Sequence, residues 1–390
     1  MKETTSVFLI IFINVLFLLY GISTLSISYY EADIFFNDRN LIHYIVQASC
    51  KLFGQNDYAL RLPFIILHVA STVLLYKVGK PHLKRKIDRV SSILIYVLLP
   101  GTISAALLVN GAGVVIFFTL LFIFLYQEDK KIASYVVLAL TILADPGFMV
   151  LYFLLFFFAT AKRELPLMMV SLALFSFAAY FYGFNISGKP KGYFLDTFGI
   201  YTAIFSPFLF LYFIYTMYRI LIKKQKTLLW WISFGAFVFS LLLSFRQRIP
   251  IEDFAPYAVI ATPLIVRTFF NSYRVRLPEH RKIHKIVLGV TLAVLIINSS
   301  LAIFNHAMYG FYANKTKHFA YPYHVVKELA YALHVKGVNR LHVEDERLAL
   351  RLKFYGIEDG LEFKLSRVKN GDITIKYFNT VVDSFSILKF

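Results

Sequence analysis

The sequence predicts an all-α polytopic membrane protein with about 11 transmembrane helices and a small C-terminal α/β domain. Of its 390 residues, 58% are hydrophobic and 16% are charged, and its mean hydropathy is +0.63. Soluble domains have about 45–50% apolar and about 25% charged residues, so most of this chain is expected in a membrane. The net charge of +18 does not indicate nucleic-acid binding, because the Lys and Arg residues cluster in short loops between apolar segments.

Apolar segments of roughly 17–25 residues are long enough to cross a bilayer as helices. The candidates, several of them shorter than a full crossing, lie at residues 6–26, 62–78, 90–109, 112–127, 132–143, 147–161, 165–184, 201–222, 228–245, 257–270 and 286–305.

The basic loops predict the orientation of the chain. Lys and Arg gather at residues 80–89, 130–131, 162–163, 223–226 and 274–285. With a cytoplasmic N-terminus, the alternation of spans places all of these loops on the cytoplasmic face, as the positive-inside rule requires. The sequence therefore predicts a multi-pass protein of a bacterial-type inner (plasma) membrane.

The same alternation divides the chain into two predicted domains. Residues 1–305 form a transmembrane domain whose first outer loop spans residues 27–61. Residues 306–390 contain no apolar run of membrane length and form a small extracytoplasmic domain. Within it, the pattern predicts helices at 325–334 and 346–354 and strands at 340–343, 363–368, 373–378 and 385–390.

The first outer loop contains a predicted amphipathic helix. Leu41, Ile45, Ala48 and Leu52 recur at spacings of four, three and four, so they share one helical face. A helix of this kind lies in the plane of the membrane interface. Gly54 is expected to end it, and Pro63 is expected in the first turn of the next helix.

Two acidic residues of this loop are candidates for chemistry. Glu31 and Asp33 follow the first apolar segment directly. A carboxylate near hydrocarbon usually faces a polar cavity, and transfer of a sugar to a hydroxyl or amine needs a base. The alternative is that both acids are simply solvated beyond a helix end.

Three arginines are candidates for binding a phosphate. Arg61, Arg246 and Arg248 lie on the predicted outer face, against the positive-inside bias. A guanidinium forms bidentate hydrogen bonds with phosphate oxygens. The alternative is that these side chains snorkel at helix ends.

A divalent-cation site is a further hypothesis. Glu252 and Asp253 closely follow Arg246 and Arg248. They either form ion pairs with these arginines or hold Mg²⁺ or Mn²⁺ together with Glu31 or Asp33. Carboxylate oxygens are the ligands that these cations prefer.

A family resemblance rests on residues 31–63. An acidic motif and an amphipathic helix are followed by Leu52-Phe53-Gly54-Gln55-Asn56-Asp57-Tyr58-Ala59-Leu60-Arg61-Leu62-Pro63. This order, with its phenylalanine-glycine and arginine-leucine-proline elements, resembles family 39 GT-C glycosyltransferases, which are related to protein O-mannosyltransferases and lipid A aminoarabinose transferases. The resemblance implies a polyprenyl-phosphate sugar donor and inversion of the anomeric centre.

The resemblance also implies a catalytic Asp-Glu pair in the first outer loop, and here the sequence departs from it. Tyr30 stands where the Asp of the pair would fall if Glu31 matches its Glu. Either Asp33 takes the role of the missing Asp, or Glu31 acts alone as the base, or the protein is a degenerate enzyme. By the same resemblance, Arg246 and Arg248 sit where the family has a basic residue near the donor phosphate.

The sequence therefore predicts an integral membrane hexosyl- or pentosyltransferase that acts on a protein, lipid or glycan acceptor at the extracytoplasmic face. Glu31 or Asp33 is the predicted base, and Arg61, Arg246 and Arg248 are the predicted phosphate ligands. One alternative is a transporter or flippase of a lipid-linked or anionic substrate, which would have polar residues at mid-membrane and paired broken helices. Another is a catalytically silent GT-C relative.

Overall fold

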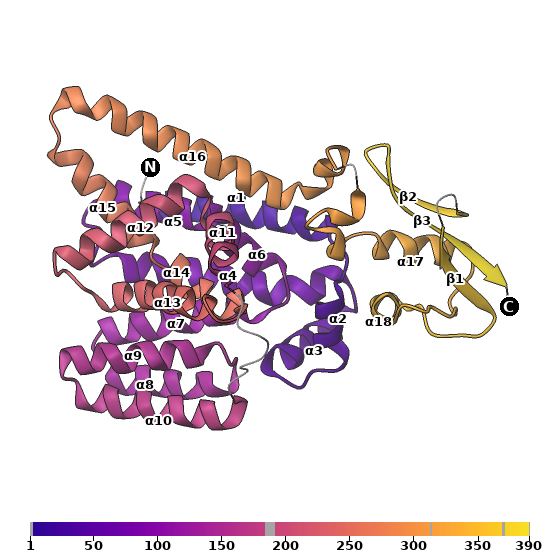
Figure 1. Ribbon diagram of the computed structural model, residues 1–390, viewed down its shortest axis with the longest axis horizontal. Helices are drawn as coiled ribbons and strands as arrows, with labels where there is room; N and C mark the ends of the chain where they lie inside the picture. The colour runs from indigo at the N-terminus through magenta and orange to yellow at the C-terminus, as the bar shows by residue number, and fades with distance from the viewer. Residues whose placement is uncertain (1–2, 184–191, 313, 369–370, 390) are drawn as a thin grey trace. The chain divides into compact units, whose positions relative to one another are not determined.

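A computed structural model describes residues 3–183, 192–312, 314–368 and 371–389 of the chain (Figure 1). The chain divides into two compact units. Unit 1 comprises Met1–Val15, Phe64–Ala106 and Asn110–Ser299, and unit 2 comprises Leu16–Pro63, Leu107–Val109 and Ser300–Phe390. The units do not follow the order of the chain, because the first outer loop falls into the same unit as the C-terminal residues.

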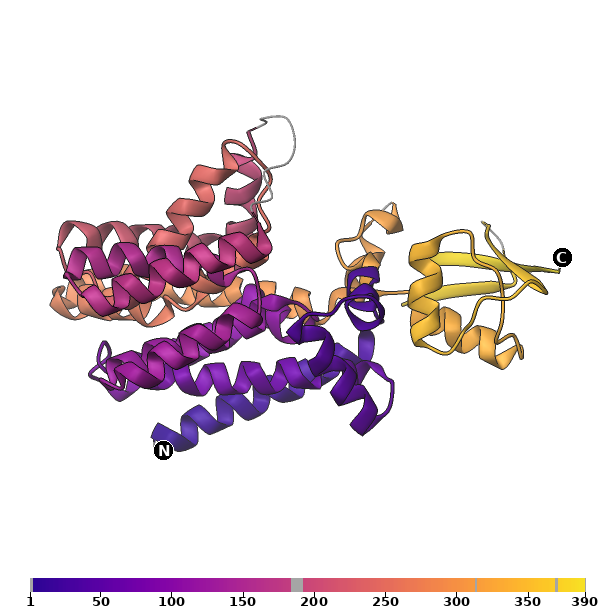
Figure 2. The ribbon, with the colours of Figure 1, turned by 90° about the horizontal axis from the view of Figure 1, so that it is seen from below.

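Unit 1 is helical. Its elements, some of which continue into unit 2, are α1 (Glu3–Thr24), α4 (Asp57–Gly79), α5 (Lys86–Leu98), α6 (Pro100–Leu107), α7 (Gly111–Gln127), α8 (Lys131–Leu140), η1 (Thr141–Leu143), α9 (Phe148–Lys162), α10 (Leu165–Tyr182), α11 (Phe194–Phe205), α12 (Pro207–Ile222), α13 (Leu228–Ser244), η2 (Ile251–Asp253), α14 (Ala255–Val259), α15 (Thr262–Val275), η3 (Pro278–His280) and α16 (Arg281–Ile303). Helices α9 and α10 lie side by side in both ribbon views (Figures 1 and 2).

The prediction of about 11 full crossings is not confirmed. Among the described residues, four helical segments are long and apolar enough to span a bilayer: Glu3–Thr24, Asp57–Gly79, Leu165–Tyr182 and Pro278–Ile303. The number rises to six if each of two bent helix pairs counts as one span. Four further apolar helices are shorter, and these include Gly111–Gln127 and Leu228–Ser244. Several apolar helices of the chain thus support an integral membrane protein.

Proline explains why two predicted single spans are bent. A residue before proline disfavours the α conformation, so a helix tends to stop there. Leu99, before Pro100, has a ψ of 127°, and α5 and α6 meet at 59°. Ser206, before Pro207, has a φ of 74°, and α11 and α12 meet at 105°. Residues 90–109 and 201–222 therefore each contain a break within the described chain.

Unit 2 combines short helices with a three-stranded sheet. Besides the ends of α1, α4 and α16, its elements are α2 (Tyr29–Phe36), α3 (Leu41–Phe53), η4 (Asn305–Gly310), η5 (Lys315–Lys317), η6 (Tyr321–Tyr323), α17 (Val326–Val335), α18 (Glu346–Phe354), β1 (Phe363–Arg367), β2 (Ile373–Tyr377) and β3 (Thr380–Lys389). The sheet is antiparallel, with strand order β1-β3-β2.

The sequence predicted the C-terminal helices closely and one strand wrongly. Helices α17 and α18 match the predicted ranges within one residue at each end, and β3 begins earlier than predicted. Residues 340–343 do not form a strand of the sheet, since Arg340 and His342 make isolated parallel bridges with Glu358 and Lys364. These residues alternate poorly between buried and exposed positions, so a regular ladder has little to stabilise it.

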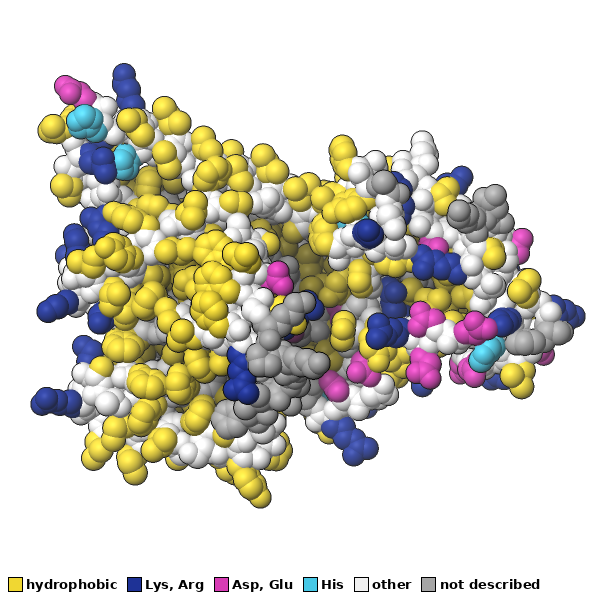
Figure 3. Space-filling model, viewed as in Figure 1, with side chains coloured by type: hydrophobic (Ala, Val, Ile, Leu, Met, Phe, Trp, Pro, Cys, Tyr) yellow, Lys and Arg dark blue, Asp and Glu magenta, His cyan; other side chains and the backbone are white. Residues whose placement is uncertain are grey.

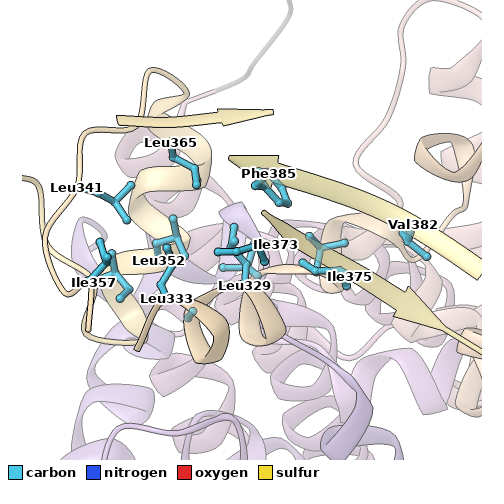
Figure 4. Close-up of a cluster of buried hydrophobic side chains, with 14 of the residues drawn as sticks. Leu329, Leu333, Leu341, Leu352, Ile357, Leu365, Ile373, Ile375, Val382 and Phe385 are labelled. Carbon is cyan, nitrogen blue, oxygen red and sulfur yellow. The ribbon is translucent and has the colours of Figure 1, made fainter. Parts of the chain in front are cut away.

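The core of unit 2 lies between the sheet and two helices. Leu329 and Leu333 of α17 and Leu352 of α18 face Ile373 and Phe385 of the sheet (Figure 4). Strand β2 alternates strictly between buried and exposed residues, as a strand with one covered face should. This core fixes the position of α18, which carries Arg351 and is followed directly by Tyr355, two residues of the candidate site described below.

Helix α3 confirms the predicted amphipathic helix but buries a different face. Its N-cap is Asn40, and Gly54 ends it with a φ of 83°, which favours glycine. Ile42, Val46 and Cys50 are buried, whereas Leu52 of the predicted apolar face is 78% exposed. The helix carries apolar residues on two adjacent faces, and sequence periodicity alone does not decide which of them packs against protein.

Pro63 lies inside α4 and not in its first turn, contrary to the prediction. Helix α4 begins at Asp57, so Pro63 removes the N–H that would bond to the carbonyl of Ala59. The hydroxyl of Ser49 donates to that carbonyl oxygen at 2.5 Å. Ser49 is buried, so α3 supplies the hydrogen bond that the helix itself has lost.

We expect Ser49→Ala to destabilise the protein by about 1–2 kcal/mol, because it leaves a buried carbonyl without a donor. The measurement is the thermal unfolding of the purified protein in detergent. In a Pro63→Ala background, residue 63 regains its N–H, so the loss caused by Ser49→Ala should shrink. Equal losses in both backgrounds would show that the hydroxyl does not compensate for the proline.

A cluster of buried histidines and tyrosines stabilises unit 2 near η4. The ring of His306 stacks on Tyr377 and meets the ring of His324, each with 4.2 Å between centroids. The Tyr309 hydroxyl lies 2.8 Å from His324 Nδ1. Burial lowers the pKa of His306 to about 4 and that of His324 to about 2. Both rings are therefore neutral in the folded protein at neutral pH.

Acid should therefore destabilise unit 2 selectively. An unfolded histidine titrates near 6.5, so below that pH the unfolded state binds more protons, and stability falls as the pH drops towards 4. Hydrogen exchange of η4 and β2, followed between pH 7 and 4.5, should show this loss. His306→Phe keeps the stacking and should weaken the pH dependence, whereas His280→Phe, at an exposed position, should not. An unchanged profile for His306→Phe would contradict the prediction.

Candidate active site

The acidic motif begins helix α2 with a capping box. Ser28 is the N-cap, with extended backbone, and its hydroxyl accepts a hydrogen bond from the Glu31 N–H at 3.2 Å. In return, Glu31 Oε2 accepts from the Ser28 N–H at 2.9 Å. This reciprocal pair is the signature of a serine followed three residues later by glutamate, and it turns the Glu31 side chain back towards the helix start.

Glu31 is buried and bonded through both of its oxygens. Arg61 Nη2 donates to Glu31 Oε2 at 2.9 Å and to the carbonyl of Ser26 at 2.9 Å. The N–H of Val109 donates to Glu31 Oε1 at 3.0 Å. Arg61 Nη1 lies 3.4 Å from Asp57 Oδ1, one helical turn earlier in α4. The side chains of Arg61 and Glu31 are 0% and 2% exposed.

Residues of the C-terminal segment complete this network within unit 2. The hydroxyl of Tyr355 donates to Asp57 Oδ1 at 2.7 Å, and Lys327 Nζ lies 3.1 Å from Asp57 Oδ2. Arg351 Nε donates to the carbonyl of Ile27 at 2.8 Å. Burial, reinforced by the Asp57 carboxylate, raises the pKa of Tyr355 above its ordinary value. Tyr355 therefore remains a donor to Asp57 at physiological pH.

The sequence analysis missed the partners of Arg61. Asp57 could have been found, because it precedes Arg61 by four residues in one helix, the spacing of an intrahelical ion pair. Tyr355, which bonds to Asp57, and Arg351, which bonds to Ile27, carry no such signal, since they lie 298 and 324 residues from those partners along the chain.

Asp33 lies near Glu31 in sequence but in a different environment. It is partly exposed, and its Oδ1 accepts a hydrogen bond from Asn37 Nδ2 at 2.7 Å. Tyr30, one turn before Asp33 in α2, is 73% exposed. Residues three apart share a helical face, so Tyr30 and Asp33 lie on the outward side of α2, away from the Glu31 side.

The three predicted phosphate ligands have different local environments. Arg61 is fully buried and its guanidinium already bonds to two carboxylates, so this geometry does not support a phosphate role for it. Arg246 and Arg248 are exposed in the segment between α13 and η2. Within the described residues neither of these two forms an ion pair, so both guanidinium groups are available to an anion.

A second acidic group lies in unit 1. Gly147 is bordered by two carboxylates: a Cβ added there would lie 2.9 Å from Asp145 Oδ1 and 3.2 Å from Asp253 Oδ1. The Gly147 N–H donates to Asp145 Oδ1 at 2.8 Å. Burial raises the pKa of Asp145 to about 6, and burial together with Asp145 and Glu252 raises that of Asp253 to about 7. Burial and like-charge repulsion both disfavour the ionised form of these carboxyl groups.

The hypothesis of a divalent-cation site receives no geometric support. In the described part of the chain, no three His, Cys, Asp or Glu side chains converge in a way that would hold a metal ion. Glu31, one of the four proposed ligands, already accepts hydrogen bonds from two backbone N–H groups and from Arg61.

Comparison with known proteins supports the family resemblance. Residues 40–184, a little over a third of the chain, match the family described as dolichyl-phosphate-mannose-protein mannosyltransferase. The match is confined to this segment. A search of curated proteins gives no match. The matched segment includes α3, Asp57 and Arg61, and it begins four residues after the end of α2.

The match to this family suggests membrane glycosyltransferase activity at the general level. Together with the apolar helices, it supports an integral membrane protein and is consistent with a lipid-linked sugar donor.

We expect Arg61→Leu to destabilise the protein by about 3–5 kcal/mol, because it leaves the carboxylate of Glu31 buried without a cation and leaves Asp57 with Lys327 alone. Adding Glu31→Gln to this variant should recover part of the loss, since the uncompensated Glu31 charge is removed. The measurement is the thermal unfolding of the parent protein, of Arg61→Leu and of the double variant. Arg39→Leu, at an exposed position, is the matched control, and an equal loss there would contradict the assignment.

Proposed function

We propose that the protein transfers a sugar from a polyprenyl-phosphate donor to an acceptor on the extracytoplasmic face of the membrane, with inversion of the anomeric centre. The observation that carries this proposal is the position of α2. A firmly anchored acidic helix directly precedes the segment that matches the mannosyltransferase family. A protein, a lipid or a glycan each offers the hydroxyl or amine that such a reaction requires.

Asp33 is the catalytic base in this proposal, and Glu31 is a positioning residue. Both oxygens of Glu31 accept hydrogen bonds from buried donors and its side chain is 2% exposed, so a substrate has little direct access to this carboxylate. Asp33 is partly exposed and forms no ion pair with another described residue. General bases need direct access to the proton that they remove.

The presence of tyrosine at position 30, where the resembling family has an aspartate, also favours Asp33 as the base. In the resembling family, the residue before the glutamate is an aspartate, and here that position is occupied by exposed Tyr30. Asp33 lies one helical turn further along the same face of α2. The carboxylate is thus displaced by one turn, about 5 Å along the helix, but it keeps its outward direction.

The reaction then needs one base and cations for the leaving phosphate. Asp33 accepts the proton of the acceptor hydroxyl while the acceptor oxygen forms a bond to the anomeric carbon. The bond from that carbon to the phosphate oxygen breaks, and polyprenyl phosphate leaves with the electron pair. Arg246 and Arg248, exposed and without ion-pair partners among the described residues, are proposed to bind the donor phosphate.

The experiment measures transfer of labelled sugar from a panel of polyprenyl-phosphate donors in membranes that contain the protein. We expect Asp33→Asn to lower transfer by about 10²–10⁴-fold, the contribution of a general base, without a change in thermal stability. The double variant Tyr30→Asp/Asp33→Asn should regain part of the activity, because it returns a carboxylate to the same face. Asp38→Asn, in the same loop, is the matched control.

Other outcomes would redirect the assignment. Full activity of Asp33→Asn, with loss of activity and retained stability in Glu31→Gln, would make Glu31 the base. Loss of donor affinity in Arg246→Ala and Arg248→Ala, compared with Lys223→Ala, would support the phosphate role. Absence of transfer by the parent with every donor of the panel would favour a catalytically silent relative or a transporter.

A transporter or flippase is the second candidate, because of the two bent helix pairs and one polar cluster inside unit 1. His68 Nε2 lies 3.0 Å from Asn14 Oδ1, and its ring stacks on that of buried Tyr96. Buried polar groups within membrane helices often line a substrate path. Uptake or flipping of a labelled lipid-linked sugar by proteoliposomes, abolished by His68→Leu, would support this candidate.

A further inference from the structure

A groove of about 650 Å³ lies in unit 1 between α5, α12, α15 and α16. This volume is within the range of about 300–1,000 Å³ that small-molecule sites usually have. Its walls are largely aliphatic and aromatic, with Leu94, Phe208, Phe269 and Val287 among them. Leu94, Phe208 and Val287 are 36–54% exposed, so the groove is open along one side.

The two basic residues of the groove lie at one end. His284 is in the first turn of α16 and Arg276 directly follows α15, with Ser272 in the last turn of α15. These are the helix ends that adjoin the basic segments 80–89 and 274–285. Figure 3 shows the same division, with hydrophobic side chains along α16 and Lys, Arg and His side chains where α15 leads into α16.

The net charge at this end of the groove is positive, and some of its basic side chains have no ion-pair partner among the described residues. Arg274 pairs with Asp88, and Glu3 pairs with Arg89, so two of the nearby acids are already neutralised. Arg276 has no hydrogen bond or ion pair from its guanidinium within the described residues, and His284 Nδ1 is buried there without a hydrogen-bond partner. An anionic group at the mouth of the groove would satisfy both side chains.

This end is remote from the proposed donor-phosphate ligands. Helix α13 begins just after the basic segment 223–226 and ends just before Arg246. Its 17 residues correspond to about 25 Å, so Arg246 and Arg248 lie at the opposite end of the helical unit from that segment. Helix α12, which lines the groove, ends at the same basic segment. A ligand headgroup at Arg276 is therefore separate from the proposed reaction.

We propose that the groove binds a diacyl phospholipid with an anionic headgroup. The acyl chains lie against the apolar walls, where they make van der Waals contacts with the side chains. The phosphate faces Arg276 and His284, to which it accepts charge-assisted hydrogen bonds. Charge complementarity selects an anionic over a zwitterionic lipid, since juxtamembrane basic residues attract anionic lipid surfaces.

The test is a lipid titration of the purified full-length protein in detergent, read by native mass spectrometry. The probes are phosphatidylglycerol and phosphatidylcholine with identical acyl chains. We expect phosphatidylglycerol to bind about tenfold more tightly. Arg276→Ala/His284→Ala should abolish this preference. Lys282→Ala/Lys285→Ala removes charge from the same helix at exposed positions outside the groove and should retain it.

A second variant tests the groove itself. Ser91→Phe places a ring on the wall of the groove, reduces its volume and should weaken the binding of both lipids. Equal affinity for the two lipids in the parent protein would overturn the proposal. It would also be overturned if Lys282→Ala/Lys285→Ala lost the preference for phosphatidylglycerol as fully as Arg276→Ala/His284→Ala does. Displacement of phosphatidylglycerol by polyprenyl phosphate at equal concentration would also overturn it, because the groove would then accept the donor lipid in preference to a phospholipid.

Discussion

The ion pair between Glu31 and Arg61 is the interaction on which unit 2 depends. Removing two charges from water is costly unless their remaining donors and acceptors are satisfied. Here Glu31 receives two backbone N–H groups as well as the guanidinium, and Arg61 also donates to the Ser26 carbonyl and lies near Asp57. The pair therefore connects the start of α2, the start of α4 and the segment at Val109.

The C-terminal segment depends on the same pair through Asp57. Tyr355 and Lys327 bond to the carboxylate that faces Arg61, and Arg351 bonds to the backbone just before α2. Since α17 and α18 are held by the core against the sheet, the position of α2 is set by elements that are far apart in the chain. The C-terminal residues thus act as part of the support for the acidic helix.

Burial of Glu31 has a direct consequence for the rest of α2. A helix that turns position 31 inward must turn positions 30 and 33 outward. The tyrosine that replaces the aspartate of the resembling family is therefore on the accessible face, and Asp33 is on it too. Under the proposed function, Glu31 has the structural role and Asp33 has the chemical role.

The sequence by itself determined the membrane class, the clustering of basic loops, the amphipathic α3 and the two C-terminal helices, because hydropathy and periodicity are local properties. It also carried the resemblance that the match over residues 40–184 supports. The number of crossings was not determined, since prolines at positions 100 and 207 bend segments that read as continuous. Only the tertiary structure decided that Arg61 is a buried partner of Glu31 and that Tyr355 supports Asp57. Those contacts depend on residues separated by up to about 300 positions, and no local pattern encodes them.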